Sequence, residues 1–331
     1  MGLKVKESPR FRTVVNSLTE FSFYLHYFLI APLHCYYNTT SSITEENMKK
    51  ISMLLVLFLA ASFVLFAGGK QESGAAASAS QFSGDYAFGG STTVDPIIQA
   101  AIEEWKELYP DVHISYEGVG SSTGIKGIIA GTYSLGAASR EPKDGEKAQG
   151  VEATHIALDA IAAIVNQSSV SISNISMANL ASIYAGDITN WKEVGGPDAP
   201  IVVFNRDEAS GTYETFEGHV MKKADKEFMA SASVTTGNGD MAAKVGSTPY
   251  AIGYVGLGFT HEKGVKALTL EGIEPDVKNV YNKSYPVWRY LNVVHIGPLS
   301  QAGEVEQAFV DYLLSEDGQD IVEDLDFIRL P

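Results

Sequence analysis

The sequence predicts a doubly wound α/β fold for the chain from residue 86 onward. Apolar runs of β type alternate there with segments whose apolar residues recur every three or four positions. Three of the β-type runs lead into a loop of Gly, Ser and Thr and then into the start of a helix. These loops occupy residues 89–93, 118–124 and 206–212. The arrangement is typical of strands whose carboxyl ends meet at one edge of a sheet.

The first predicted helix covers residues 95–109, with Asp95 as its expected N-cap and Pro96 in the first helical position. Apolar residues at helical spacing indicate one buried face, formed by Ile98, Ala101, Ile102, Trp105 and Leu108. A strand, a helix and a second strand are expected next, at 112–116, 125–130 and 133–138.

A nearly continuous apolar run at 156–165 is typical of a strand that is buried on both faces or crosses between two lobes. The helix that follows has Ser176 as its candidate N-cap and places Leu180, Ile183 and Tyr184 on its inner face. Further helices are expected at 213–223, 241–245, 305–314 and 319–325, and further strands at 201–204, 250–255 and 290–295.

Composition limits the partners of the chain. Its formal net charge is −16, which argues against nucleic acid as a partner. An anion must therefore be held by local, directional hydrogen bonds, because the overall field of the protein repels it. The single cysteine, Cys35, allows no disulfide within one chain and no Cys/His zinc site. We expect a monomer with neither a metal nor a cofactor.

The three loops have the chemistry of a site for a small oxyanion. Each places unpaired backbone N–H groups, small hydroxyls and the positive end of a helix dipole at the end of a strand. The third loop also carries Arg206, whose guanidinium can donate two parallel hydrogen bonds to one oxyanion. Gly211 lets the backbone approach a ligand closely, and Ser210 and Thr212 supply hydroxyl and N–H donors.

Each of these residues also has a structural alternative. Arg206 could form a salt bridge with Asp207, with Glu208 or with a carboxylate on a helix. Thr92, Thr93 and Ser121 could serve as helix caps alone, although a cap and a ligand donor are compatible.

The N-terminal region predicts export. A short basic stretch at Met48 precedes an apolar run at 51–66, as in a secretory signal peptide over residues 48–67. Residues 1–47 are then interpreted as an extension from a mis-assigned start codon, and residues 68–81 as a flexible tether. No cysteine follows the apolar run, so anchoring through a lipid is disfavoured.

Five motifs in this order resemble the PstS family, the extracytoplasmic phosphate-binding subunits of ABC phosphate importers. They occupy residues 90–96, 120–125, 136–141, 206–212 and 251–258. The resemblance covers residues 84–331 and implies a type II periplasmic-binding-protein fold with two lobes that close over one phosphate. Each lobe is then a mixed, mostly parallel sheet flanked by helices. The implied lobes are 82–160 with 286–331, and 161–285.

The resemblance also implies a ligand set and a partner. Positions that match the phosphate contacts of the family are Thr92, Thr93, Ser121, Arg206, Ser210, Gly211 and Thr212. The partner implied is the membrane permease of an ABC phosphate importer, outside the cytoplasm.

One position departs from the pattern of many members. They end the third strand with an aspartate that accepts the proton of bound phosphate, whereas this chain has Ser139 followed by Arg140. The Ser139 hydroxyl can accept that proton with a lone pair, and Asp95, Asp207 or Glu208 could take over the role. Arg140 is expected either to touch the ligand or to tie the two lobes together.

Other functions stay open beside phosphate capture. Without the aspartate, another tetrahedral oxyanion such as sulfate, molybdate or tungstate is an alternative ligand. A serine-dependent phosphate-ester hydrolase is a remote one, because Ser210 lies in Ala-Ser-Gly rather than in a Gly-x-Ser-x-Gly turn. An adhesin or sensory subunit that reuses the binding fold is a third. We expect a binding protein rather than an enzyme.

Overall fold

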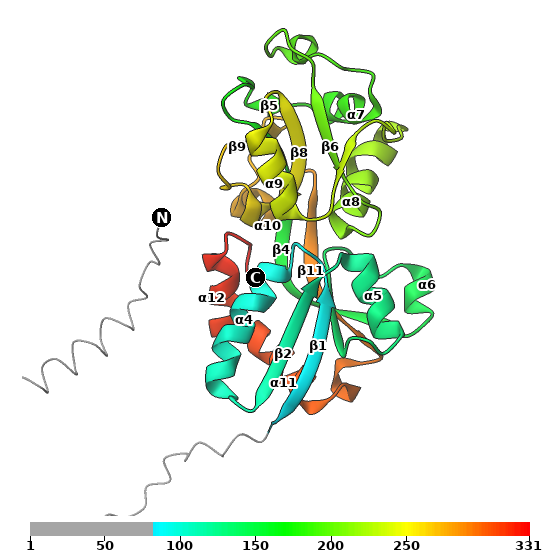
Figure 1. Cartoon of the computed structure of the whole chain (residues 1–331), viewed down its shortest axis with the longest axis vertical. Helices are drawn as coiled ribbons and strands as arrows, with labels where there is room; N and C mark the ends of the chain where they lie inside the picture. The colour runs from blue at the N-terminus through cyan, green and yellow to red at the C-terminus, as the bar shows by residue number, and fades with distance from the viewer. Residues whose placement is uncertain (1–81) are drawn as a thin grey trace, which may run out of the picture. The chain divides into compact units, whose positions relative to one another are not determined.

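The computed structural model describes residues 82–331 of the chain (Figure 1). The predicted N-terminal extension, signal peptide and tether lie outside these residues, as does Cys35. Among the helices of residues 82–331, none is long and apolar enough to cross a membrane.

Nine strands form a mixed sheet in the order β2-β1-β3-β11-β4-β8-β6-β7, with β9 also paired to β4. Strands β1, β2 and β3 pair in parallel, as do β6, β7 and β8, while β4 and β11 run antiparallel to their neighbours. The strands are β1 (Gly84–Gly90), β2 (Val112–Gly118), β3 (Leu135–Ala138), β4 (Val151–Asn166), β6 (Val202–Arg206), β7 (Ser233–Thr235), β8 (Ala251–Gly256), β9 (Val265–Ala267) and β11 (Trp288–Ile296). A separate pair consists of β5 (Asn174–Ile175) and β10 (Thr269–Leu270).

Helices cover both faces of the sheet. They are α4 (Asp95–Leu108), α5 (Ser121–Ile129), α6 (Asp144–Lys147), α7 (Met177–Ala185), α8 (Gly211–Phe216), α9 (Asn238–Ser247), α10 (Val277–Tyr281), α11 (Glu304–Leu314) and α12 (Glu316–Asp324). The first half of the molecule is built around β1, β2 and β3, with α4, α11 and α12 packed on one face and α5 on the other (Figure 1). The second half is built around β6, β7 and β8, with α7 and α9 in separate core clusters. This mixed α/β architecture confirms the predicted fold class.

Strand β4 connects the two halves. Its residues 151–160 pair with β11 and its residues 161–165 pair with β8, so one strand belongs to both halves of the sheet. All residues from Ile156 to Asn166 are buried, which explains the apolar run in this part of the sequence. The crossing strand predicted there is confirmed.

Two predictions about the first helix are wrong. The N-cap of α4 is Val94, and Asp95 is the first helical residue, with no side-chain cap. The Ser91 hydroxyl accepts hydrogen bonds from the backbone N–H groups of Thr93 and Val94 instead and closes this turn. Leu108, expected on the buried face, is 58% exposed because it is the last residue of the helix.

Other helices begin or end a few residues away from their predicted positions. Helix α5 begins at Ser121, four residues earlier than expected, directly after Gly120 with a φ of 90°. The helix predicted at 213–223 is not one α-helix, because α8 ends at Phe216 and a π-helical turn follows at Glu217–Met221. Ser176 caps α7 as predicted, by accepting a hydrogen bond from Asn179 N.

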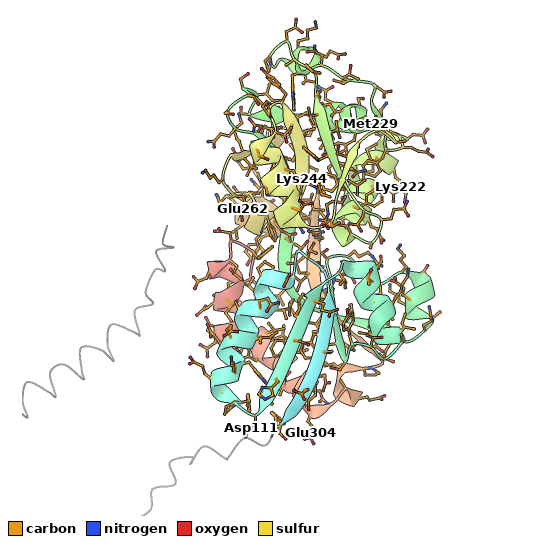
Figure 2. All side chains as sticks on the ribbon, in the orientation of Figure 1. Asp111, Lys222, Met229, Lys244, Glu262 and Glu304 are labelled. Carbon is orange, nitrogen blue, oxygen red and sulfur yellow. The ribbon has the colours of Figure 1, made fainter. Side chains whose placement is uncertain are left out.

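Charged side chains of both halves extend outward, as those of Lys222, Glu262 and Glu304 do (Figure 2). Three charged residues, Arg206, Arg289 and Asp159, are instead at most 5% exposed. Burial of a charge is costly unless something compensates it, so these three residues require an explanation.

Candidate anion-binding site

The three Gly/Ser/Thr loops meet where the two halves of the molecule come together. Thr93 Oγ1, in the first loop, lies 3.1 Å from Thr212 Oγ1 in the third. Ser121 Oγ, in the second loop, lies 3.3 Å from Ser139 Oγ at the end of β3. Arg206 Nη2 donates to Thr92 Oγ1 at 3.2 Å and so joins the third loop to the first. Side chains up to 119 residues apart in the sequence therefore line one region.

A glycine is needed at the centre of this region. A Cβ atom at Gly211 would lie 2.4 Å from Ser121 Oγ and 2.7 Å from Ser139 Oγ. Both distances are far shorter than any normal contact, so a side chain at Gly211 would displace the two hydroxyls. Ser210, just before it, accepts a hydrogen bond from Tyr213 N and caps α8.

Arg206 is a buried cation with unused hydrogen-bond donors. It is the last residue of β6, is 2% exposed and donates through Nη2 to Thr92 Oγ1 and to the carbonyl of Thr236. Within residues 82–331, its Nε and Nη1 atoms have no hydrogen-bond partner and no carboxylate lies within ion-pair distance. Burial lowers the pKa of this guanidinium, which nevertheless stays charged at neutral pH.

The structural alternative for Arg206 does not form. The Asp207 carboxylate is turned back into the loop, where Oδ1 accepts a hydrogen bond from Ala209 N at 2.9 Å. Glu208 is exposed. Neither acidic residue pairs with Arg206 in the described part of the chain, so the cation is available to an anion between the loops.

Arg289 is a second buried cation, and sequence reasoning missed it. It lies on β11 and forms an ion pair with Asp159 on β4, with Nη2 to Oδ2 at 2.7 Å. Asp159 is fully buried, and burial raises the pKa of its carboxyl while Arg289 opposes that shift. The available signal was an aspartate inside the apolar run at 156–165, because a buried carboxylate needs a cationic partner.

Asn238 is the other side chain that was missed. It begins α9, is fully buried and donates through Nδ2 to Thr92 Oγ1 at 3.2 Å and to Thr93 Oγ1 at 2.9 Å. It thereby connects the second half of the molecule to the first loop. A short polar residue before a helix is so common a pattern that the sequence carried no usable signal for this contact.

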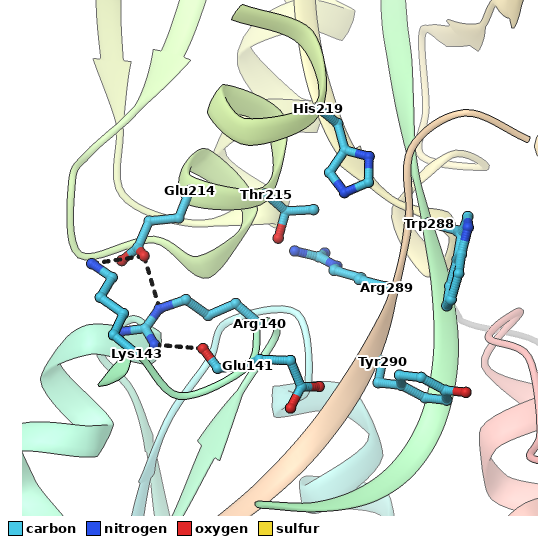
Figure 3. Close-up of a pocket in the computed structure, with 9 residues that line it drawn as sticks. All are labelled: Arg140, Glu141, Lys143, Glu214, Thr215, His219, Trp288, Arg289 and Tyr290. Carbon is cyan, nitrogen blue, oxygen red and sulfur yellow. Dashed lines mark hydrogen bonds and ion pairs between the residues drawn. The ribbon is translucent and has the colours of Figure 1, made fainter. Parts of the chain in front are cut away.

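Arg140 ties the two halves together rather than facing the loops. Its guanidinium pairs with Glu146 at 2.7 Å. It also pairs with Glu214, on α8, at 3.0 Å (Figure 3). Its remaining donors are taken by Ser122 Oγ and the carbonyl of Glu141. Each guanidinium nitrogen of Arg140 lies within 3.0 Å of a protein oxygen among the described residues, although Nε makes an ion pair with Glu214 without a hydrogen bond. These contacts favour the tie between the two halves over the ligand contact that was also considered for Arg140.

The Arg140 ion pairs border a pocket of about 430 Å³ between the two halves (Figure 3). Three groups of the first half contact the Glu214 carboxylate. Besides Arg140, Lys143 Nζ lies 2.8 Å from Oε2, and Ser122 Oγ donates to Oε1 at 2.8 Å. This cluster of Arg140, Lys143, Glu146 and Glu214 is called the seam cluster below.

Among the candidates for the proton acceptor of bound phosphate, Ser139 is the best placed. It is 1% exposed, and its Oγ faces Ser121 Oγ beside Gly211. Asp207 is engaged in its own loop and Glu208 is exposed. Asp95 lies beside Gly118, where burial raises the pKa of its carboxyl.

Comparison with known proteins identifies the family to which the chain is related. The sequence profile of the PBP superfamily domain matches residues 73–317. The phosphate-binding protein PstS of Borreliella burgdorferi is 34% identical over 250 residues, which cover 73% of this chain and 88% of that protein. The Bacillus subtilis protein of the same name is 32% identical over 292 residues, 85% of this chain and 95% of that protein.

The chain belongs to the PstS family of phosphate-binding proteins.

Solved structures add the shape of the fold. A Clostridium perfringens protein assigned to phosphate ABC transport, crystallised with bound phosphate, is 37% identical with a TM-score of 0.70, and the match covers 75% of this chain and all of that one. A phosphate transport receptor from Vibrio cholerae is 28% identical with a TM-score of 0.62, and the match covers 74% of this chain and all of that one. This PstS-family chain therefore has the type II periplasmic-binding-protein fold that its sequence predicts.

Proposed function

We propose that this PstS-family protein binds inorganic phosphate between two lobes and delivers it to the membrane permease of an ABC phosphate importer. The proposed lobes are residues 82–160 with 286–331, and residues 161–285. Binding would shift an equilibrium between open and closed arrangements, because a ligand that contacts both lobes favours the closed one. The proposed ligand set contains Thr92, Ser121, Ser139, Arg206, Ser210, Gly211 and Thr212. Thr93 supports this set through its hydroxyl, which lies 3.1 Å from that of Thr212, and Arg140 is left out.

The observation that carries this proposal is the unpartnered guanidinium of Arg206. A cation that is 2% exposed, with two nitrogen atoms unpaired among the described residues, is unfavourable in the free protein. An oxyanion between the loops supplies both the missing charge and the missing acceptors. The names of the relatives, and the phosphate bound to the Clostridium perfringens structure, point to phosphate as that oxyanion.

Serine at position 139 sets the expected selectivity. Monohydrogen phosphate carries a proton that needs an acceptor, whereas sulfate at neutral pH carries none. The Ser139 hydroxyl has lone pairs for this proton, and Ser121 Oγ is its neighbour at 3.3 Å. A hydroxyl can also donate, so we expect rejection of sulfate to be weaker than a carboxylate at this position would give.

Isothermal titration of the purified protein with phosphate and with sulfate tests the proposal. We expect tight binding of phosphate and much weaker binding of sulfate. Equal affinity for both anions, or heat with sulfate alone, would contradict the phosphate assignment and favour another tetrahedral oxyanion. Turnover of a chromogenic phosphate ester would instead favour the hydrolase alternative.

Location outside the cytoplasm is a separate part of the proposal. It depends on the predicted signal peptide at residues 48–67 and on the absence of a cysteine directly after its apolar run. N-terminal sequencing of the exported protein is expected to show a start near residue 68 without a lipid. A start within residues 1–47 would contradict the predicted signal peptide.

A further inference from the structure

Arg289 contacts two residues of the proposed ligand set and also Thr93, which supports that set. Its Nη1 donates to the Ser139 carbonyl at 3.1 Å and to Thr212 Oγ1 at 3.0 Å, and its Nη2 donates to Thr93 Oγ1 at 3.2 Å. Its Nε and the second hydrogen of Nη2 go to Asp159 Oδ2. All five guanidinium hydrogens are thus engaged. Thr93 and Thr212 come from opposite halves of the molecule, so Arg289 holds one hydroxyl of each.

These contacts determine the direction of the Thr93 hydroxyl. Its Oγ1 receives one hydrogen bond from Arg289 Nη2 and another, at 2.9 Å, from Asn238 Nδ2. The orientation of the Asn238 amide is settled by Gly256 N, which can only donate and bonds to Asn238 Oδ1. Both lone pairs of Thr93 Oγ1 are therefore occupied by groups that only donate. Its own hydrogen must point to Thr212 Oγ1, 3.1 Å away.

The Thr212 hydroxyl is determined in turn. Its Oγ1 accepts from Arg289 Nη1 and, by the step above, from Thr93. Both of its lone pairs are then filled, so the Thr212 hydrogen must be donated elsewhere. Within residues 82–331, Thr212 Oγ1 has no other hydrogen-bond partner. The Thr212 hydrogen is therefore left without an acceptor among these residues, in the residue directly after Gly211 of the third loop.

Because Asp159 neutralises Arg289, Arg289 affects the loops through the orientation of hydroxyl groups rather than through its charge. The Asp159 carboxylate is 0% exposed and pairs with Arg289, so the two together add almost no net charge next to the loops. Arg206 remains the cation available to the anion. Because the five donors of Arg289 are all engaged, it reaches bound phosphate only through the hydroxyls that it orders.

We propose that Arg289 is a positioning residue for phosphate binding, which orders the Thr93 and Thr212 hydroxyls so that Thr212 presents its hydrogen to the anion as a fixed donor. The inference rests on the proposed function. A donor held in place before binding costs no ordering when the anion arrives, so its loss weakens affinity.

A double-mutant cycle tests the proposal by phosphate titration. Thr212→Val removes the donor without changing the shape, and we expect phosphate affinity to fall at least about tenfold. Arg289→Lys keeps the charge but cannot reach both hydroxyls, and we expect a similar loss. The double variant is expected to bind within about threefold of Thr212→Val alone, because Arg289 acts through that hydroxyl. If the fold-loss of phosphate affinity in the double variant equals the product of the two single losses, the proposal is overturned. Full phosphate affinity of Arg289→Lys would also overturn it.

Controls separate positioning from folding. Thr212→Ser keeps the hydroxyl, so we expect it to recover a large part of the affinity that Thr212→Val loses. If Arg289→Lys does not fold, the cycle of Thr93→Val with Thr212→Val decides, since both changes preserve shape. We expect the double variant to lose little more phosphate affinity than Thr212→Val alone. If the affinity losses of the two single variants are independent, the proposed ordering of Thr212 by Thr93 is wrong. Failure of the wild-type protein to bind phosphate would contradict the proposed function itself, which distinguishes the two failures.

Discussion

Two buried arginines lie between the halves of the molecule, and they differ in what surrounds them. Arg140, 6% exposed, is held by the carboxylates of Glu146 and Glu214 in the seam cluster. Arg206, 2% exposed, has no carboxylate within ion-pair distance in the described part of the chain. Both side chains are buried cations, but only one of them is neutralised by the protein.

The pKa of each arginine follows from this difference. Burial acts to lower the pKa of Arg140, but Glu146 and Glu214 outweigh it, and the net shift is upward. Burial lowers the pKa of Arg206, and the more distant charges of Asp207 and Asp240 do not restore it. A buried cation that the protein does not compensate identifies the place for an anion, whereas a compensated one identifies a structural tie.

The largest effect is expected from Arg206→Met. Removing this buried cation, which has no carboxylate partner among the described residues, should weaken phosphate binding by about 3 kcal/mol, more than 100-fold, because the anion would be buried without its counter-charge. The free energy of unfolding without phosphate should stay the same or rise, since an uncompensated charge is removed. Titration and thermal unfolding, each with and without phosphate, measure the two quantities.

Arg206→Lys is the matched control for that substitution. It keeps the positive charge but loses the fork that donates to one oxyanion through two nitrogens, so we expect an intermediate loss of affinity. Near-normal phosphate binding by Arg206→Met would show that Arg206 does not bind the anion. The functional difference proposed between Arg206 and Arg140 would then be wrong.

Glu214→Gln tests the other region. The change removes the acidic partner shared by Arg140 and Lys143 across the two halves, and we expect phosphate affinity to fall about tenfold because the closed arrangement loses an ion-pair network. Glu217→Gln is the control, since in residues 82–331 Glu217 has an ion pair with the exposed Lys222 alone, and it should leave phosphate affinity unchanged. Equal effects of both substitutions would argue against a specific interlobe tie.

A smaller effect is expected from Ser139→Ala. Loss of the hydroxyl removes the proposed acceptor for the phosphate proton, so the preference for phosphate over sulfate should narrow by about fivefold, close to 1 kcal/mol. Paired titrations with the two anions give this ratio. A parallel loss for both anions would show that Ser139 acts only as a donor.

The smallest effect concerns acid stability through Glu146. Burial acts to raise the pKa of this carboxyl, but its bonds to Arg140 and Lys143 outweigh burial and lower the pKa below its ordinary 4.5. The folded state therefore binds fewer protons near that pH than the unfolded state does. The stabilisation is present above pH 4.5 and is lost as the pH falls through the lowered value.

Denaturant unfolding at a series of pH values measures this contribution. Wild type should lose more stability than Glu146→Gln between neutral pH and pH 3, a difference of no more than about 1 kcal/mol for a partly exposed pair. Identical pH profiles would show that the Arg140 pairs contribute nothing to acid stability.

Several parts of the site could be predicted because their signals are local. The loops around Thr92, Ser121 and Ser210 combine glycine, a hydroxyl and a helix start within a few residues, and the structure brings them together. Arg206 stood out because it directly precedes such a loop. Asp159 stood out only as a charged residue inside an apolar run, and nothing local pointed to Arg289 as its partner, because 130 residues separate the two.

The sequence by itself determined the alternation of strands and helices, the buried crossing strand and the loops that carry anion donors. These features depend on periodicity and on residues next to each other, which local backbone and side-chain chemistry controls. Only the tertiary structure decided that Arg140 is neutralised by Glu214, that Arg206 is not, and that Arg289 orders two hydroxyls from opposite halves. The physical reason is that charge compensation and hydrogen-bond direction depend on distances in space between residues far apart in the chain.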